Sequence, residues 1–158
     1  MSPAVDFGLA GCWFGEGNRP DVVAAARAWM GTPYAHQASL RGAGCDCLGL
    51  VRGMWREIVG PEPLPVPPYS PDWCEVGGRE VLIEALGQAM TPCTIGSAPP
   101  GALLVFRMRR RAVAKHCGVL SAAGRMIHAR ERLGVIEEAL TPFWTRRIVA
   151  AFAFPEPR

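Results

Sequence analysis

Residues 44–57 read GCDCLGLVRGMWRE and contain the pattern that decides the fold. Apolar residues recur there at helical spacing and a Gly-Pro pair follows, so a helix is predicted from about Cys47 to Val59. Cys47 then lies in the first turn, where free N–H groups and the positive end of the helix dipole favour a thiolate. Cys47 is therefore a candidate nucleophile. The alternative is a small buried apolar residue, the commoner role of a cysteine at a helix start.

Two of the three histidines lie in predicted strands further along the chain. His116 opens the apolar run HCGVL, and His128 lies in the next run, MIHA, after a turn at Ala123-Gly124. His116 is seven residues before this turn and His128 four after it, so we expect an offset pair rather than direct opposition. One imidazole would accept the thiol proton and the second would orient the first, as in a catalytic triad. The alternative is that each is an ordinary strand residue, since spacing alone does not bring either to Cys47.

Helical patterns fill the first part of the chain, and strand patterns fill the second. Two further helices are predicted, from Asp21 to a stop at Gly31 and from Arg79 to Met90. A loop follows at residues 91–101, and after it short apolar runs predict five strands, at 102–108, 116–121, 125–129, 135–140 and 148–154. Helices followed by strands with hairpin-length turns predict an α+β domain with an antiparallel sheet.

The chain has 158 residues, 49% hydrophobic and 20% charged, which is enough to bury one sizeable core. This composition excludes a disordered tail, and 18 glycines and 15 prolines exclude a coiled coil or helical bundle. Residues 1–18 are predicted to form an irregular arm with Trp13 and Phe14 as anchors, and residues 19–158 a single domain. Six prolines in residues 61–71 predict an extended run across the surface.

Net charge and hydropathy exclude two classes of partner. The net charge of +3 is too small to indicate nucleic-acid binding, and no apolar run approaches the roughly 20 residues of a membrane span. The first residues lack the pattern of a secretory signal, so we expect a protein made, and at first kept, in a reducing cytoplasm. The basic residues from Arg107 to Lys115 are expected to form a solvated turn, or else to contact an anionic polymer or an acidic protein.

The six cysteines are expected to be free thiols, metal ligands or a nucleophile, because disulfides are rare in a reducing compartment. A metal-binding module is a rival hypothesis, with Cys45, Cys47, His116 and Cys117 as possible zinc ligands. Cys45 with Cys47, and His116 with Cys117, are spaced more tightly along the chain than the ligands of structural zinc sites. No phosphate or dinucleotide motif is present, so neither metal nor cofactor is predicted.

Five short motifs occur in a specific order and spacing: GTPY at 31–34, DCLGLV at 46–51, PPGALLVFR at 99–107, HCGVL at 116–120 and MIHA at 126–129. Together they resemble the NlpC family of cell-wall peptidases, which are papain-like cysteine peptidases. More narrowly, the chain is similar to the branch found at the tail tips of phages and phage-like gene transfer agents. The resemblance runs from about Asp21 to Phe154. It implies N-terminal helices packed on a central antiparallel sheet of about five to six strands.

The resemblance implies a role for five residues. Cys47 matches the nucleophile, His116 the general base, and His128 the third polar residue that orients the base. Tyr34 matches a tyrosine that lines the active site and helps the backbone N–H of Cys47 to hold the oxyanion. Asp46 matches an acidic residue associated with the free amino end of the substrate. Without the resemblance, Tyr34 reads as a core aromatic and Asp46 as a helix cap.

The implied reaction is hydrolysis of peptide stems of peptidoglycan, at the bond between D-γ-glutamate and the following diamino acid, without a cofactor. The implied route is delivery in a phage-like tail tip, with tail-tip or hub proteins as partners and the target cell envelope as the place of action. A catalytically idle structural component of such a tail tip is the alternative from another class.

The sequence departs from the family pattern at three places. Leu48 and the longer loop with His36 bear on the peptide preference, whereas Ala102 is expected to be a structural change only. Leu48 replaces the usual serine after the nucleophile, Ala102 replaces a common aspartate, and His36 with the RGAG segment stands where many members have Trp-Gly-Gly. His36 has no assigned role. The other cysteines are expected to be packing thiols: Cys12, Cys45, Cys74, Cys93 and Cys117.

Overall fold

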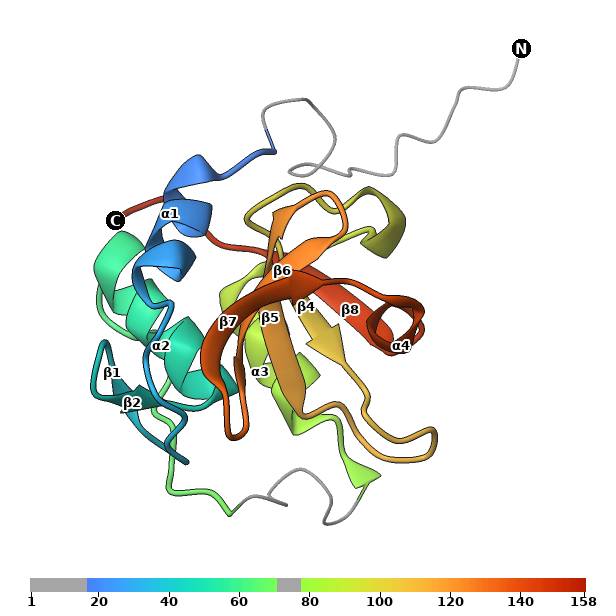
Figure 1. Ribbon diagram of the computed structural model, residues 1–158, viewed down its shortest axis with the longest axis horizontal. Coiled ribbons are helices and arrows are strands. Elements are labelled where there is room, and N and C mark those ends of the chain that lie inside the picture. Colours follow the sequence, from blue (N-terminus) through green and yellow to red (C-terminus); the bar gives the residue numbers. More distant parts are fainter. Residues whose placement is uncertain (1–16, 71–77) are drawn as a thin grey trace.

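The structure is a computed structural model that describes residues 17–70 and 78–158. Its centre is a six-stranded antiparallel sheet with the strand order β3-β8-β4-β5-β6-β7 (Figure 1). The strands are β3 (Thr91–Cys93), β4 (Leu103–Phe106), β5 (His116–Ala122), β6 (Arg125–Arg130), β7 (Gly134–Ala139) and β8 (Ile148–Ala153). The helices are α1 (Pro20–Ala28), α2 (Cys47–Ile58), α3 (Val81–Ala89) and α4 (Pro142–Thr145), and a separate sheet pairs β1 (Ser39–Leu40) with β2 (Gly44–Cys45). The predicted α+β class with an antiparallel sheet is confirmed.

The two faces of the main sheet are covered by different helices. α1, α2 and α3 supply apolar side chains to the larger core on one face, which includes Trp29 and Met54. On the other face, α4 contributes Trp144 to a smaller apolar cluster. Successive side chains of β5 therefore meet different surroundings: Cys117 belongs to the larger core, whereas the ring of His116 lies 5.6 Å from that of Trp144.

α2 begins at the residue that the sequence pattern predicts. Asp46 is its N-cap, and Oδ1 of Asp46 accepts a hydrogen bond of 2.7 Å from the backbone N–H of Gly49. Further along α2, Gly53 packs directly against the indole of Trp29, where any Cβ would collide with the ring. The N-cap fixes where α2 starts, and the close packing fixes α2 against its neighbour. Both hold Cys47 in one position.

A β-bulge interrupts the hairpin of β5 and β6. Next to the turn Ala122 pairs with Arg125, but on the far side of Ser121 the pairing becomes Leu120 with Met126. Ser121 is thus one extra residue on β5, and it shifts the register by one.

This shift decides which side chains share a face of the sheet. Continuing the register beyond the bulge sets Gly118 opposite His128, so His116 lies diagonally from His128 on the same face. If the same residues paired without a bulge, Val119 would lie opposite His128 and the two histidines would lie on opposite faces, because a shift of one residue exchanges the faces of a strand. The predicted offset relation of His116 and His128 is confirmed.

Two predictions for residues 91–101 are wrong. This segment contains β3, which pairs with β8 at the edge of the sheet, and a short 3-10 helix, Ile95–Ser97. An edge strand tolerates Pro92, whose missing N–H would break a central strand. Cys93 is disulfide-bonded rather than a packing thiol.

Other parts of the chain agree with the sequence or lie outside the description. Residues 61–70 form neither helix nor strand, as the prolines predict. Trp13, Phe14, Cys12 and Cys74 lie outside the described residues. α4 and the sheet of β1 and β2 were not predicted, because four residues and two residues are too short to show a period.

Candidate active site

Cys47, the first residue of α2, opens onto a cleft of about 510 Å³. Its Sγ lies 3.7 Å from the backbone oxygen of Lys115, the residue before β5. Four of the five residues singled out in the sequence line this cleft, and the fifth, His128, is completely buried behind His116. The four are Tyr34, Asp46, Cys47 and His116.

A line of hydrogen bonds runs from His116 across the sheet. Nε2 of His116 lies 2.7 Å from Nδ1 of His128, and Nε2 of His128 lies 2.6 Å from Oε1 of Glu138 on β7. Arg130 in turn donates to both carboxylate oxygens of Glu138, at 3.1 and 3.3 Å. Because Nε2 of His116 is engaged by His128, Nδ1 is the nitrogen left for the hydrogen bond between His116 and Cys47.

The surroundings of Cys47 hold the pKa of its thiol well below the ordinary value. A hydrogen bond from the Cys117 thiol contributes most, and the hydrogen bond and charge of His116 add to it, whereas burial and Asp46 act in the opposite direction. The pKa of Cys117 is raised well above the ordinary value, by its hydrogen bond to Cys47 and by burial. These opposite shifts favour a protonated Cys117 beside an ionised Cys47, and Sγ of Cys117 also donates to the backbone oxygen of Cys47 at 3.5 Å.

The pKa of Cys45, only two residues before Cys47, is shifted in the opposite direction. It is completely buried, and burial, reinforced by the charges of Asp46 and Cys47, raises the pKa of its thiol to about 12. At neutral pH Cys45 therefore remains a thiol, which is a poor nucleophile.

His128 is kept neutral inside the sheet. Burial and the charge of His116 lower the pKa of His128 to about 4, although Glu138 opposes this shift. Trp144 covers both imidazoles, with its ring centroid 5.6 Å from that of His116 and 5.0 Å from that of His128. Since Trp144 is itself almost completely buried, it keeps water from the hydrogen bond between the histidines.

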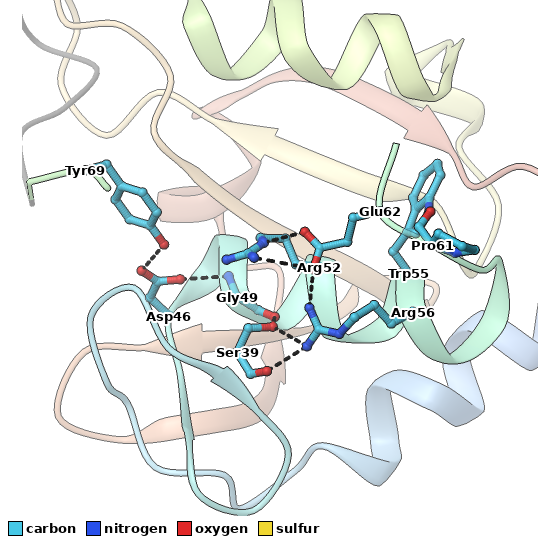
Figure 2. Close-up of polar contacts among 9 residues, drawn as sticks. All are labelled: Ser39, Asp46, Gly49, Arg52, Trp55, Arg56, Pro61, Glu62 and Tyr69. Atoms are coloured by element: carbon cyan, nitrogen blue, oxygen red, sulfur yellow. Dashed lines mark hydrogen bonds and ion pairs between the residues drawn. The ribbon is translucent and has the colours of Figure 1, made fainter. Parts of the chain in front are cut away.

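The carboxylate of Asp46 is held by three hydrogen bonds from the protein. Oδ2 accepts a hydrogen bond of 2.7 Å from the backbone N–H of Gln37. Figure 2 shows the other two bonds, from the backbone N–H of Gly49 to Oδ1 and from the hydroxyl of Tyr69 to Oδ2 at 2.6 Å. Tyr69 also accepts a hydrogen bond of 2.8 Å at its backbone oxygen from Nε2 of His36. Asp46 thereby joins the start of α2 to two loops that border the cleft.

The proline-rich segment of residues 61–70 is fastened to α2 at both ends (Figure 2). At the first end, Arg52 and Arg56 form ion pairs with Glu62, and the indole of Trp55 donates to the backbone oxygen of Pro61 at 3.0 Å. At the second end, Tyr69 reaches Asp46. Of this segment, Tyr69 lines the cleft at Cys47. Residues 62–67 instead line a neighbouring apolar pocket, together with Leu48 and Val51 of α2.

Tyr34 is half-buried and lines the cleft near Cys47. Burial, with the charges of Cys47 and Asp46, raises the pKa of Tyr34 to about 12. Its hydroxyl therefore stays protonated and can donate a hydrogen bond.

Four side chains that contact these residues were not predicted from the sequence as part of the site: Tyr69, Cys117, Trp144 and Glu138. Tyr69 follows a proline-rich run without periodicity, and Trp144 lies in a single turn of helix. Only Glu138 could have been found from the sequence, by pairing the two predicted strands that contain it and His128. Pairing of β6 with β7 sets Met126 opposite Glu138, so His128 and Glu138 are diagonal neighbours on one face.

Two negative findings apply to residues 17–70 and 78–158. They contain no cluster of three or more His, Cys, Asp or Glu side chains suited to a metal ion. None of their helices has the length and apolar character needed to cross a bilayer.

Comparison with protein families and solved structures identifies the fold. The sequence model of the NlpC/P60 family matches residues 31–153. The crystal structure of the NlpC/p60 domain of the peptidoglycan hydrolase SagA has a TM-score of 0.61 and 23% identity, covering 85% of this chain and 97% of that one.

Two longer proteins have similar folds. An NlpC/P60 family protein from Bacillus cereus has a TM-score of 0.59 and 19% identity, over 84% of this chain and 38% of that one. A lipoprotein-like NLP/P60 family protein from Staphylococcus aureus has a TM-score of 0.59 and 16% identity, over 92% of this chain and 44% of that one. The chain thus spans less than half of either protein. No curated protein matches it significantly. The fold that the sequence motifs implied is confirmed.

Proposed function

Because the chain belongs to the NlpC/P60 family, we propose that it is a cysteine endopeptidase that hydrolyses the peptide stems of bacterial peptidoglycan. One observation carries the proposal. Cys47 has a depressed pKa, opens onto a cleft, and is hydrogen-bonded to an imidazole that a second, buried imidazole orients. These are the parts of a nucleophile, a base and an orienting group.

In the proposed reaction, Sγ of the Cys47 thiolate attacks the carbonyl carbon of the scissile amide, and the π electrons move onto the oxygen. The backbone N–H of Cys47 and the hydroxyl of Tyr34 then stabilise the oxyanion. Support for this role of Tyr34 is its protonated hydroxyl in the cleft.

The leaving amine takes the proton from Nδ1 of His116 as its bond to the carbonyl carbon breaks, which leaves an acyl-enzyme on Cys47. His116, now neutral, accepts a proton from water, whose oxygen attacks the thioester and releases the carboxylic acid. His128 stays neutral in both steps and accepts the hydrogen bond from Nε2 of His116.

We further propose the bond between D-γ-glutamate and the following diamino acid as the scissile bond, with the free amino end of the stem near Asp46. Support comes from the position of Asp46 and Tyr69 on the wall of the cleft. The carboxylate of Asp46 is almost completely buried and already accepts three hydrogen bonds, so an ammonium group would share the Oδ2 side with the Tyr69 hydroxyl. Leu48 presents an apolar surface in the same cleft.

The test is digestion of purified peptidoglycan, followed by mass spectrometry of the released fragments. We expect stem fragments that begin with the diamino acid. Cys47→Ala should abolish their release, whereas Cys45→Ala should retain it, because Cys45 is a buried, protonated thiol. Equal loss in both variants, with folding intact, would contradict the assignment of the nucleophile. Intact peptidoglycan after treatment with folded wild-type protein would favour the idle structural component instead.

The proposed place of action is the target cell envelope, reached in a phage-like tail tip with tail-tip or hub proteins as partners. Its support is the sequence resemblance, together with the exposed residues 109–111 of the turn between β4 and β5. Arg107 in the same turn is ion-paired with Glu80, and Lys115 lines the cleft, so neither shares that exposed position. Replacing Arg109, Arg110 and Arg111 by glutamine should weaken association with tail particles or cell walls. Association insensitive to these changes and to salt would indicate a solvated turn.

A further inference from the structure

We propose that Glu138 is a positioning residue of this site, which fixes the tautomer of His128 and, through it, the orientation and charge of His116. The inference rests on the proposed role of Cys47 as the nucleophile. Neither the sequence motifs nor the family match assigns a role to Glu138.

The contacts of Glu138 come from two directions. Oε1 lies 2.6 Å from Nε2 of the completely buried His128, and Arg130 donates to both oxygens from the other side. Because β6 and β7 pair in regular register, Glu138 reaches His128 as its diagonal neighbour. Glu138 is thus held between a buried imidazole and a guanidinium at the rim of the cleft.

The hydrogen-bonding capacity of these groups allows one arrangement of protons. A carboxylate only accepts, so Nε2 of His128 must carry the hydrogen that it donates to Glu138. A neutral His128 then has a lone pair at Nδ1, and this nitrogen can only accept, so Nε2 of His116 carries a hydrogen and donates it across 2.7 Å. Only Nδ1 of His116 remains to exchange a proton with Cys47.

Removing the carboxylate would lift this constraint. Nε2–H of His128 would be a buried donor without its acceptor, so the other tautomer, with hydrogen on Nδ1, would gain population. That tautomer points an N–H at the N–H of His116. The two donors repel, His116 turns away or loses its proton, and the thiolate of Cys47 loses the imidazolium that stabilises it.

An ordinary surface ion pair between Glu138 and Arg130 is the competing explanation. It accounts for the contacts with Arg130, but it predicts no effect on His128 or on the reactivity of Cys47. Neighbouring Glu137 provides the comparison within the same strand. It forms ion pairs with Arg27 and Arg125 and has a similar exposure.

The test uses two readouts that require no substrate. The first is ¹⁵N NMR of the three histidines, which reports the tautomer of His128 directly. The second is the pH profile for alkylation of Cys47 by iodoacetamide, with mass spectrometry to distinguish it from Cys45 and Cys117. The variants are Glu138→Ala, the matched control Glu137→Ala, and Glu138→Gln, whose amide oxygen can still accept from His128.

We expect wild type and Glu137→Ala to carry the hydrogen of His128 on Nε2. Glu138→Ala should shift it towards Nδ1 and slow alkylation of Cys47 at about pH 6 by about tenfold, the scale of the loss when the partner that orients a metal-ligating histidine is removed. Glu138→Gln should restore most of the reactivity, and it also serves if the alanine variant does not fold.

The inference is overturned if wild-type His128 carries its hydrogen on Nδ1, or if both Glu138 variants match Glu137→Ala in tautomer and alkylation. Failure of wild type to cleave peptidoglycan would contradict the proposed function alone, because neither readout depends on that substrate.

Discussion

Gly118 on β5 is a position where adding one methyl group should displace His128. A Cβ added there would lie 2.9 Å from Cβ of His128 and 3.2 Å from the backbone oxygen of Ile127, whereas ordinary contacts are 3.4–4 Å. The absence of a side chain at Gly118 therefore lets His128 lean across β5 towards His116. Gly118→Ala would force His128 away by at least 0.5 Å, the difference between 3.4 and 2.9 Å.

The size of the effect follows from this displacement. The hydrogen bond between His116 and His128 is 2.7 Å long, and a shift of 0.5 Å takes it to about 3.2 Å, the upper end of the normal range. Since a misplacement of about 1 Å can cost about 100-fold in rate, half of that should reduce kcat/KM about tenfold. The strained contact should also lower the free energy of unfolding by about 1–3 kcal/mol.

The assay is kcat/KM for release of stem fragments, measured beside chemical unfolding and the alkylation profile of Cys47. Gly87→Ala in α3 is the matched control, because its Cβ would meet only Phe152, at 3.9 Å. We expect this control to keep its activity and to gain up to about 1 kcal/mol of stability, as alanine favours helix over glycine. A folded Gly118→Ala protein with wild-type kcat/KM and alkylation would refute the link between Gly118 and the histidine pair.

Three further predictions concern the groups around Cys47. The pKa of His128 is lowered from 6.5 to about 4 in the folded protein, so His128 binds a proton more readily in the unfolded state than in the folded state. The free energy of unfolding should therefore fall by up to about 3 kcal/mol from pH 6.5 to about 4, and His128→Asn should flatten this slope in chemical unfolding. Cys117→Ala should raise the pKa of Cys47 and slow its alkylation at about pH 6 severalfold, while Cys117→Ser, which keeps a donor, should not. Asp46→Ala should lower the melting temperature through a loss of about 1–2 kcal/mol, and Asp46→Asn, which still caps α2, should lose less.

The sequence was sufficient for the parts of the fold that local patterns encode. α2 has a periodic apolar face, an N-cap and a Gly-Pro stop, and its observed start is the predicted residue. β3 was missed because it has three residues, including Pro92, and owes its existence to pairing with β8 about 60 residues later. No local signal distinguishes such an edge strand from a loop.

The candidate site also has residues that a local pattern predicts and residues whose roles depend on contacts distant in the sequence. Cys47 could be chosen over Cys45 because the start of a helix is a local feature, and the opposite pKa shifts of the two thiols agree with that choice. Glu138 was missed because its role depends on the pairing register of β6 and β7, and Tyr69 because its segment has no period. Cys93 was wrongly assigned as a packing thiol because the choice rested on the expected compartment and not on the residue itself.

The arrangement of the proposed base depends on which face of the sheet each side chain takes, as well as on the presence of the histidines. His116, His128 and Glu138 come from three neighbouring strands, and they form one line of hydrogen bonds only because all three project from the same face. The bulge at Ser121 places His116 and His128 on the same face of the sheet, although it lies several residues away from either. A chain of the same length with a regular hairpin would keep every motif and still point the two imidazoles to opposite sides of the sheet. The pairing register of the hairpin is therefore as much a part of the proposed catalytic arrangement as the histidines themselves.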